Sequence, residues 1–217
     1  RIGLGYTGLG SMLLMMGLDY DSSEGREFAA KLTERMRNAA YLESTRLAKE
    51  QGAFPMFDAG EYLKSPRFAS RLPDHIKQEI RKNGIRNSHL ISIAPTGTIS
   101  IAFTDNVSGG IEPVFSLMYK RKKVEADGSK SVSEVQDYAY RLYKSMGRDP
   151  EVLVKTATTA LNMSAQSHMM MVAAVAPYVD AAISKTVNVP EDYPFEDFKN
   201  LYMDAWHAGL KGITTYR

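Results

Sequence analysis

The chain has 217 residues, with 27 lysines and arginines against 25 aspartates and glutamates, so its formal charge is only +2. A hydrophobic content of 44% and a charged content of 24% are typical of a globular chain and exclude disorder over the whole length. The apolar stretches 11–18 and 168–179 are too short to span a bilayer. The near-neutral charge also disfavours a nucleic-acid binder, whose footprint is usually strongly basic.

Cysteine is absent from the sequence. This excludes a disulfide, a thiolate zinc site, an iron–sulfur cluster and a cysteine nucleophile within these residues. The histidines stand at positions 75, 89, 168 and 207, too far apart to show metal-ligand spacing. Met169–Met171 favour core filling over a soft-metal site. The sequence therefore predicts no metal site, and spacing alone defines no catalytic residue.

The first half of the chain predicts two helices and a strand. Asp21–Glu24 resembles a helix N-cap with an acidic residue three positions later, and the helix expected from it covers about 24–50. Gly52 stands where a C-terminal glycine is expected. A short amphipathic helix is predicted over 74–82. Residues 89–94 alternate and are partly β-branched, which favours a strand.

The second half predicts alternating strands and helices. Strands are expected over 114–122, 183–189 and 213–216, and helices over 135–146, from Ser164 to a kink at Pro177, and from Pro194 to Gly209. This alternation favours an α/β architecture with parallel pairing. No repeat or internal linker is evident, so residues 1–217 are predicted to form a single segment.

A glycine motif opens the chain at Gly3-Leu4-Gly5-Tyr6-Thr7-Gly8. Its spacing matches a dinucleotide-binding fingerprint, which requires a preceding strand and an acid about 20 residues later. Asp19, Asp21 and Glu24 offer acids, but only two residues precede the motif here. Glycines that allow close helix packing are the favoured interpretation.

The run 92–100, Ser-Ile-Ala-Pro-Thr-Gly-Thr-Ile-Ser, predicts a strand, a turn stopped by Pro95 and the start of a helix. Backbone N–H groups at such a start point in one direction and attract anions, phosphate above all. The hydroxyls of Thr96, Thr98 and Ser100 add donors. A capped helix start without a ligand is the alternative, and the physical argument does not separate the two.

Lys120–Lys123 form a short basic run. Such runs usually lie at a solvated strand end, and the single aromatic neighbour, Tyr119, is weak support for base stacking. The sequence thus predicts no nucleic-acid partner.

Several motifs together closely resemble ribonucleotide reductase large chains. They are residues 1–5, 86–88, 94–100, 110–115, 182–190 and 209–217, which extend from the first residue to the last. The sequences of these motifs are similar to those of the adenosylcobalamin-dependent class. The resemblance implies an α/β fold, part of the ten-stranded α/β barrel of these enzymes, with this chain as its later half.

The resemblance also implies the chemistry. In the family, cobalt–carbon homolysis makes a thiyl radical on a finger-loop cysteine, the radical abstracts the ribose 3′ hydrogen, and a cysteine pair reduces the 2′ position. This chain is expected to start after the finger loop and to stop before the cysteine-bearing tail, so it holds no catalytic residue and is inactive alone. One family function maps onto residues present here, because the loop that binds the substrate's phosphates matches Pro95, Thr96, Gly97, Thr98 and Ile99.

The last residues of the chain help to distinguish the classes of reductase. Oxygen-dependent reductases carry adjacent tyrosines on the last strand to relay a radical, whereas this sequence has Thr214 and Thr215 there, with Tyr216 one place later. The implied cofactor is adenosylcobalamin, which this segment alone is not expected to bind.

The implied partners are a ribonucleotide substrate, with diphosphates favoured, and the cysteine-bearing remainder of the reductase, with no nucleic acid and no membrane. The complete enzyme is expected in the cytoplasm. The resemblance also implies that the complete enzyme can be a homodimer. A non-catalytic nucleotide- or phosphate-binding module of the same fold is the alternative.

Overall fold

The computed structural model describes residues 1–217 apart from the side chain of Thr156. The α-helices are α1 (Leu9–Met15), α2 (Ser23–Gln51), α3 (Ala59–Tyr62), α4 (Asp74–Asn83), α5 (Gly97–Ala102), α6 (Tyr138–Ser145), α7 (Glu151–Thr156), α8 (Ala165–Val175) and α9 (Phe195–His207). The strands are β1 (Met118–Val124), β2 (Lys130–Gln136), β3 (Thr186–Asn188) and β4 (Thr214–Tyr216). Short 3₁₀-helices cover Phe68–Arg71 and Ala176–Tyr178. The mixture of helices and strands agrees with the predicted α/β class.

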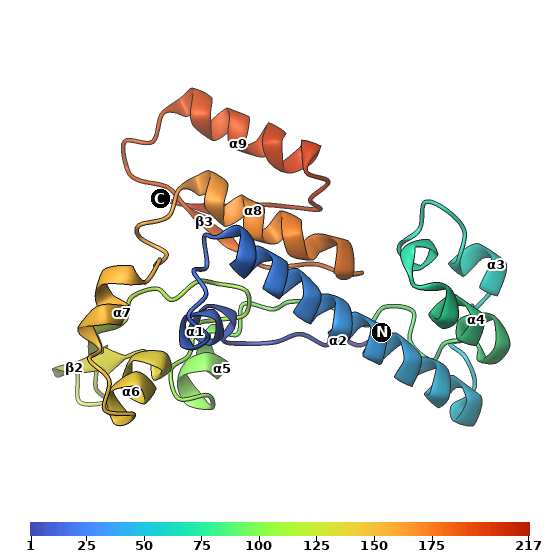
Figure 1. The fold of residues 1–217 in the computed structure, drawn as a ribbon, viewed down its shortest axis with the longest axis horizontal. Coiled ribbons are helices and arrows are strands. Elements are labelled where there is room, and N and C mark those ends of the chain that lie inside the picture. Colours follow the sequence, from blue (N-terminus) through green and yellow to red (C-terminus); the bar gives the residue numbers. More distant parts are fainter.

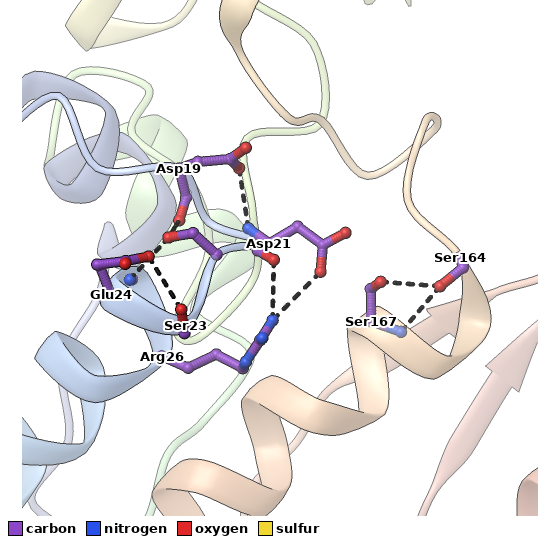
Figure 2. A network of polar contacts seen from close by, with 9 residues as sticks. Asp19, Asp21, Ser23, Glu24, Arg26, Ser164 and Ser167 are labelled. Atoms are coloured by element: carbon purple, nitrogen blue, oxygen red, sulfur yellow. Dashed lines mark hydrogen bonds and ion pairs between the residues drawn. The ribbon is translucent and has the colours of Figure 1, made fainter.

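Helix α8 begins at its predicted cap, Ser164, whereas α2 is capped by Ser22, one residue after the predicted Asp21. Ser22 accepts a hydrogen bond from the amide of Gly25 at 2.9 Å, and α2 ends at Gly52, as expected. Ser164 accepts a hydrogen bond from the amide of Ser167 at 3.0 Å (Figure 2). Each cap satisfies an amide that the first turn of a helix leaves unpaired.

Helix α2 is the longest element, and it packs against α4 near its C-terminal end and against α8 (Figure 1). The main core lies around it and is apolar. Its most deeply buried members include Leu13, Tyr41, Ile76, Ile80 and Met171, each at most 1% exposed. Burial of this apolar surface holds the three helices together.

Extended segments lie parallel beside one another in chain order. Leu4 pairs with Ile91, and Ile93 pairs with Ile183, each through an isolated parallel bridge. Beyond residue 183 the chain continues into β3, which pairs in parallel with β4. The parallel pairing predicted from the sequence is therefore confirmed, and the carboxyl ends of these segments lie at one edge.

Four predicted elements differ from the structure. The strand expected over 183–189 is reduced to β3 and an isolated bridge at Ile183. The strand expected over 89–94 is reduced to isolated bridges at Ile91 and Ile93. The strand expected from residue 114 begins only at Met118, because β1 extends as far as its antiparallel partner β2 reaches. Val135 lies in β2 and not in a helix, since cross-strand pairing with Tyr119 overrides its helical spacing. Asp137 then caps α6 by accepting a hydrogen bond from an amide of its first turn.

Helix α2 is long enough to cross a bilayer but carries many charged residues. Among the described helices, none combines the length and the apolar character that a membrane span requires.

Candidate functional site

A cavity of about 440 Å³ lies at the carboxyl edge of the parallel segments. Pro95 and Gly97 follow the segment that contains Ile91 and Ile93, while Asn188 and Tyr216 end β3 and β4. Residues 106–109, 112–113 and 115–116, with Ser100, Ile101, Tyr119, Asp137, Ala160 and Thr186, complete the lining. Open α/β sheets bind ligands outside the carboxyl ends of their strands, so this cavity is a candidate ligand site.

The turn that leads into α5 is fixed by Thr96. This residue has a φ of 51°, a left-handed conformation that few residues other than glycine adopt without support. Its Oγ1 accepts a hydrogen bond from the amide of Gly110 at 2.7 Å and shares another with Oγ1 of Thr7 at 2.8 Å. The Thr96 side chain therefore ties the turn to two other parts of the chain.

The backbone amides of Gly97, Thr98 and Ile99 have no acceptor among the residues that the structure describes. The next amide, that of Ser100, donates to the Thr96 carbonyl at 2.7 Å and closes the first helical turn. Space beside Gly97 is open, because no heavy atom lies within 4 Å of the place that a Cβ would take. The start of α5 thus offers free amides next to a cavity, an arrangement that suits an anion.

The hydroxyls expected to assist these amides are mostly engaged inside the turn. Ser100 donates its hydroxyl proton to the Gly97 carbonyl at 2.9 Å, and Thr96 is held as described above. Thr98 and Ile99 are exposed, whereas Pro95 and Gly97 line the cavity. No lysine or arginine belongs to the described lining of this cavity, so an anion would depend on the main chain.

Two carboxylates in the lining were not singled out from the sequence. Asp137 accepts hydrogen bonds at 2.8 Å from the Ser11 hydroxyl and from the amide of Ala139, and burial raises the pKa of its carboxyl. Glu112 accepts a hydrogen bond from Nζ of Lys185 at 2.6 Å. Its partner is 73 residues away in the chain, so no local pattern could have shown the contact.

The opening glycines serve close packing, as the favoured interpretation predicts. A Cβ on Gly5 would lie 2.3 Å from the carbonyl oxygen of Ser92, and a Cβ on Gly10 would lie 2.7 Å from that of Glu112. Gly8 has a φ of 83° and precedes α1 directly. Without glycine at these positions, the first segment could not lie so close to its neighbours.

The basic run lies on β1, where Lys120, Lys122 and Lys123 are exposed. Lys123 pairs with Glu125 at 2.8 Å, which agrees with a solvated strand. The histidines are not gathered into a ligand set, and the described residues contain no group of three His, Cys, Asp or Glu side chains that could hold a metal ion.

One family profile matches almost the whole chain. The profile described as "Ribonucleotide reductase, barrel domain" matches residues 1–216. The chain belongs to the ribonucleotide reductase family. The resemblance drawn from the motifs is thereby confirmed, and the segment falls within the family's barrel domain.

Curated relatives of this reductase segment include three bacterial and archaeal proteins. A vitamin B12-dependent ribonucleoside-diphosphate reductase of Mycobacterium tuberculosis (strain CDC 1551 / Oshkosh) is 34% identical over 238 residues, and one of Thermoplasma acidophilum is 30% identical over 233 residues. A vitamin B12-dependent ribonucleotide reductase of Streptomyces coelicolor is 28% identical over 263 residues. Each alignment covers 100% of this chain, which spans 31%, 28% and 27% of the respective relatives.

Proposed function

We propose that this chain supplies the substrate-phosphate turn of an adenosylcobalamin-dependent ribonucleotide reductase. The reaction would convert ribonucleotides, with diphosphates favoured, into deoxyribonucleotides. The observation that carries the proposal is the set of free amides at Gly97, Thr98 and Ile99 beside a cavity at the carboxyl edge of parallel segments. The names of the relatives support the reaction and the preference for diphosphates.

The turn would bind the polyphosphate end of the substrate through main-chain donors. Three amides pointing toward one anion act together with the partial positive charge of the helix start. Thr96 would hold these donors in place through its bonds to Gly110 and Thr7, so that little reorganisation is needed when phosphate enters. The ribose would then lie farther inside the cavity, toward β3 and β4.

Adenosylcobalamin, when bound, supplies the radical that starts the ribose chemistry. The residues of this chain do not fit as the group that receives that radical, because none of the 217 carries a thiol. We therefore assign no step of the cofactor to this segment and place the cysteine chemistry in the remainder of the reductase. We also propose that the complete enzyme is located in the cytoplasm, where ribonucleotides are consumed. The complete enzyme is proposed to be able to form a homodimer.

The test is a Gly97→Val substitution in the complete reductase. A branched side chain in the open space beside Gly97 would obstruct the approach of phosphate to the amides, so KM for the ribonucleoside diphosphate should rise. Gly212→Val is the matched control, since a Cβ there also meets no atom within 4 Å and the residue does not line this cavity. A KM unchanged by Gly97→Val would remove the turn from the substrate site.

A further inference from the structure

Lys185 places a buried ammonium group directly behind the cavity. Its side chain is only 2% exposed. Nζ lies 2.6 Å from Oε2 of Glu112, 2.8 Å from Nδ1 of His168 and 2.8 Å from the carbonyl oxygen of Thr186. An ammonium group carries three N–H donors, and here each has an acceptor. Burial lowers the pKa of Lys185, while the charge and hydrogen bond of Glu112 oppose that shift and favour the protonated form.

The partner histidine is held in one protonation state. Because Nδ1 of His168 accepts from Lys185, its proton must lie on Nε2, which faces the carbonyl oxygen of Ala160 at 3.3 Å. Burial, and then the charge of Lys185, lower the pKa of His168 to about 4. The imidazole is thus neutral and bridges Lys185 to Ala160.

All bonds of this cluster lead to the wall of the cavity. Glu112, Thr186 and Ala160 are lining residues, and they come from three separate parts of the chain. Glu112 adds a further bond, since its Oε1 accepts from the amide of Thr186 at 2.8 Å. One buried ammonium group therefore sets the spacing between the loop after α5, the segment before α8 and the start of β3.

We propose that Lys185 is a positioning residue for nucleotide binding, which holds the cavity wall formed by Glu112, Thr186 and Ala160 at the spacing that the substrate requires. This inference rests on the proposed function, because it takes the cavity to be the substrate site. Lys185 does not line the cavity itself, so it acts on the substrate only through these partners.

Stability alone does not explain such a cluster. Replacing a buried ion pair with well-packed apolar groups is often neutral or stabilising, because desolvation of the charges offsets their attraction. Removing one partner, in contrast, leaves an uncompensated charge and is strongly destabilising. A variant that removes both charges can therefore separate the effect on stability from the effect on the position of the wall.

Lys211 provides a matched control. Its Nζ also donates three hydrogen bonds, to the carbonyl oxygens of Val179, Asp180 and Ala181. It does not line the candidate cavity, and none of its three acceptors lines it either. Lys211→Met thus removes a comparable set of bonds at a place where the proposal expects no effect on nucleotide binding.

The experiment compares Lys185→Met, Lys211→Met and the double variant Lys185→Met with Glu112→Gln in the complete reductase. Melting temperature, KM and kcat for a ribonucleoside diphosphate are measured for each. We expect Lys185→Met to raise KM about tenfold, which corresponds to roughly 1.4 kcal/mol of binding. Lys211→Met should lower the melting temperature and leave KM unchanged.

The double variant distinguishes a positioning role of Lys185 from simple charge balance. It also keeps the proposal testable in the case that Lys185→Met alone does not fold. It should recover melting temperature but keep the raised KM, because no charge is left unpaired while the tether is still lost. Recovery of KM together with melting temperature would overturn the inference, and so would an unchanged KM in both variants. Gly97→Val, measured in parallel, distinguishes failure of this inference from failure of the proposed function. If Gly97→Val raises KM and the Lys185 variants do not, only the positioning role of Lys185 is wrong. If Gly97→Val leaves KM unchanged, the cavity is not the substrate site.

Discussion

The core around α2 and the region around the cavity are held together by different forces. Around α2, apolar side chains such as Ile76 and Ile80 pack with no exposed surface. Around the cavity, the tethers are polar. The Thr96 side chain binds two other parts of the chain, at Thr7 and Gly110, and the Glu112 carboxylate binds the adjacent residues Lys185 and Thr186. Under the proposed function, stability and ligand geometry depend on separate sets of residues, so substitutions in the two regions should have separable effects.

The largest expected effect on stability comes from the apolar core. Ile80→Ala should cost about 2–5 kcal/mol of unfolding free energy, because Ile80 is fully buried and its loss leaves a cavity. Denaturant unfolding of the complete reductase measures this cost. KM for the nucleotide should stay at the wild-type value in the folded variant, and a clear change in KM would break the separation between the two regions.

Thr96→Val tests a polar tether beside the cavity, where a substitution should change KM as well as stability. Valine keeps the shape of the side chain but removes the bonds to Gly110 and Thr7, and it leaves the Gly110 amide without its acceptor. The expected cost is about 1–3 kcal/mol of stability, together with a raised KM, because the turn loses its tethers. Steady-state kinetics and denaturant unfolding check both values. Thr33→Val is the control, since it also removes two side-chain hydrogen bonds, to Tyr6 and to the Ala29 carbonyl, but lies on α2 outside the cavity lining, so it should lower stability and leave KM unchanged.

The pH dependence of stability provides a weaker test of the polar tethers. The pKa of His168 is lowered to about 4, below its ordinary 6.5, so between these values the unfolded chain binds a proton that the folded chain does not. His168 should therefore contribute a loss of stability as pH falls through this window. In His168→Asn the melting temperature should fall less steeply over the same range. His207→Asn, in the exposed last turn of α9, should keep the wild-type slope, and an equal slope in all three proteins would contradict a buried neutral His168.

The smallest effect is expected at a helix cap. Ser22→Ala removes the hydrogen bond to the Gly25 amide and should cost about 1 kcal/mol. Thermal unfolding measures the loss. Ser22→Asp keeps an acceptor at the cap and should restore the melting temperature, whereas a loss of equal size would show that the cap bond is not its cause.

The sequence predicts local features well and distant ones poorly. Helix caps depend on residues three positions apart: the cap at Ser164 is confirmed, and the cap of α2 lies at Ser22, one residue after the predicted Asp21. The position of β1 depends on its pairing with β2, and the sequence placed its start four residues too early, at 114 instead of Met118.

The same division holds for the candidate site. The proposed phosphate turn is a contiguous motif, 95–99, so the sequence alone could predict it, and its binding role stays a prediction. The cluster of Glu112, His168 and Lys185 was not, because its members meet only after folding brings separate segments together.

The most direct measurement is an experimental structure of the complete reductase with a bound ribonucleoside diphosphate. The account predicts phosphate oxygens within hydrogen-bonding distance of the amide nitrogens of Gly97, Thr98 and Ile99, with the ribose in the cavity walled by Glu112 and Thr186. Phosphates bound elsewhere, with these amides facing only solvent or protein, would contradict it.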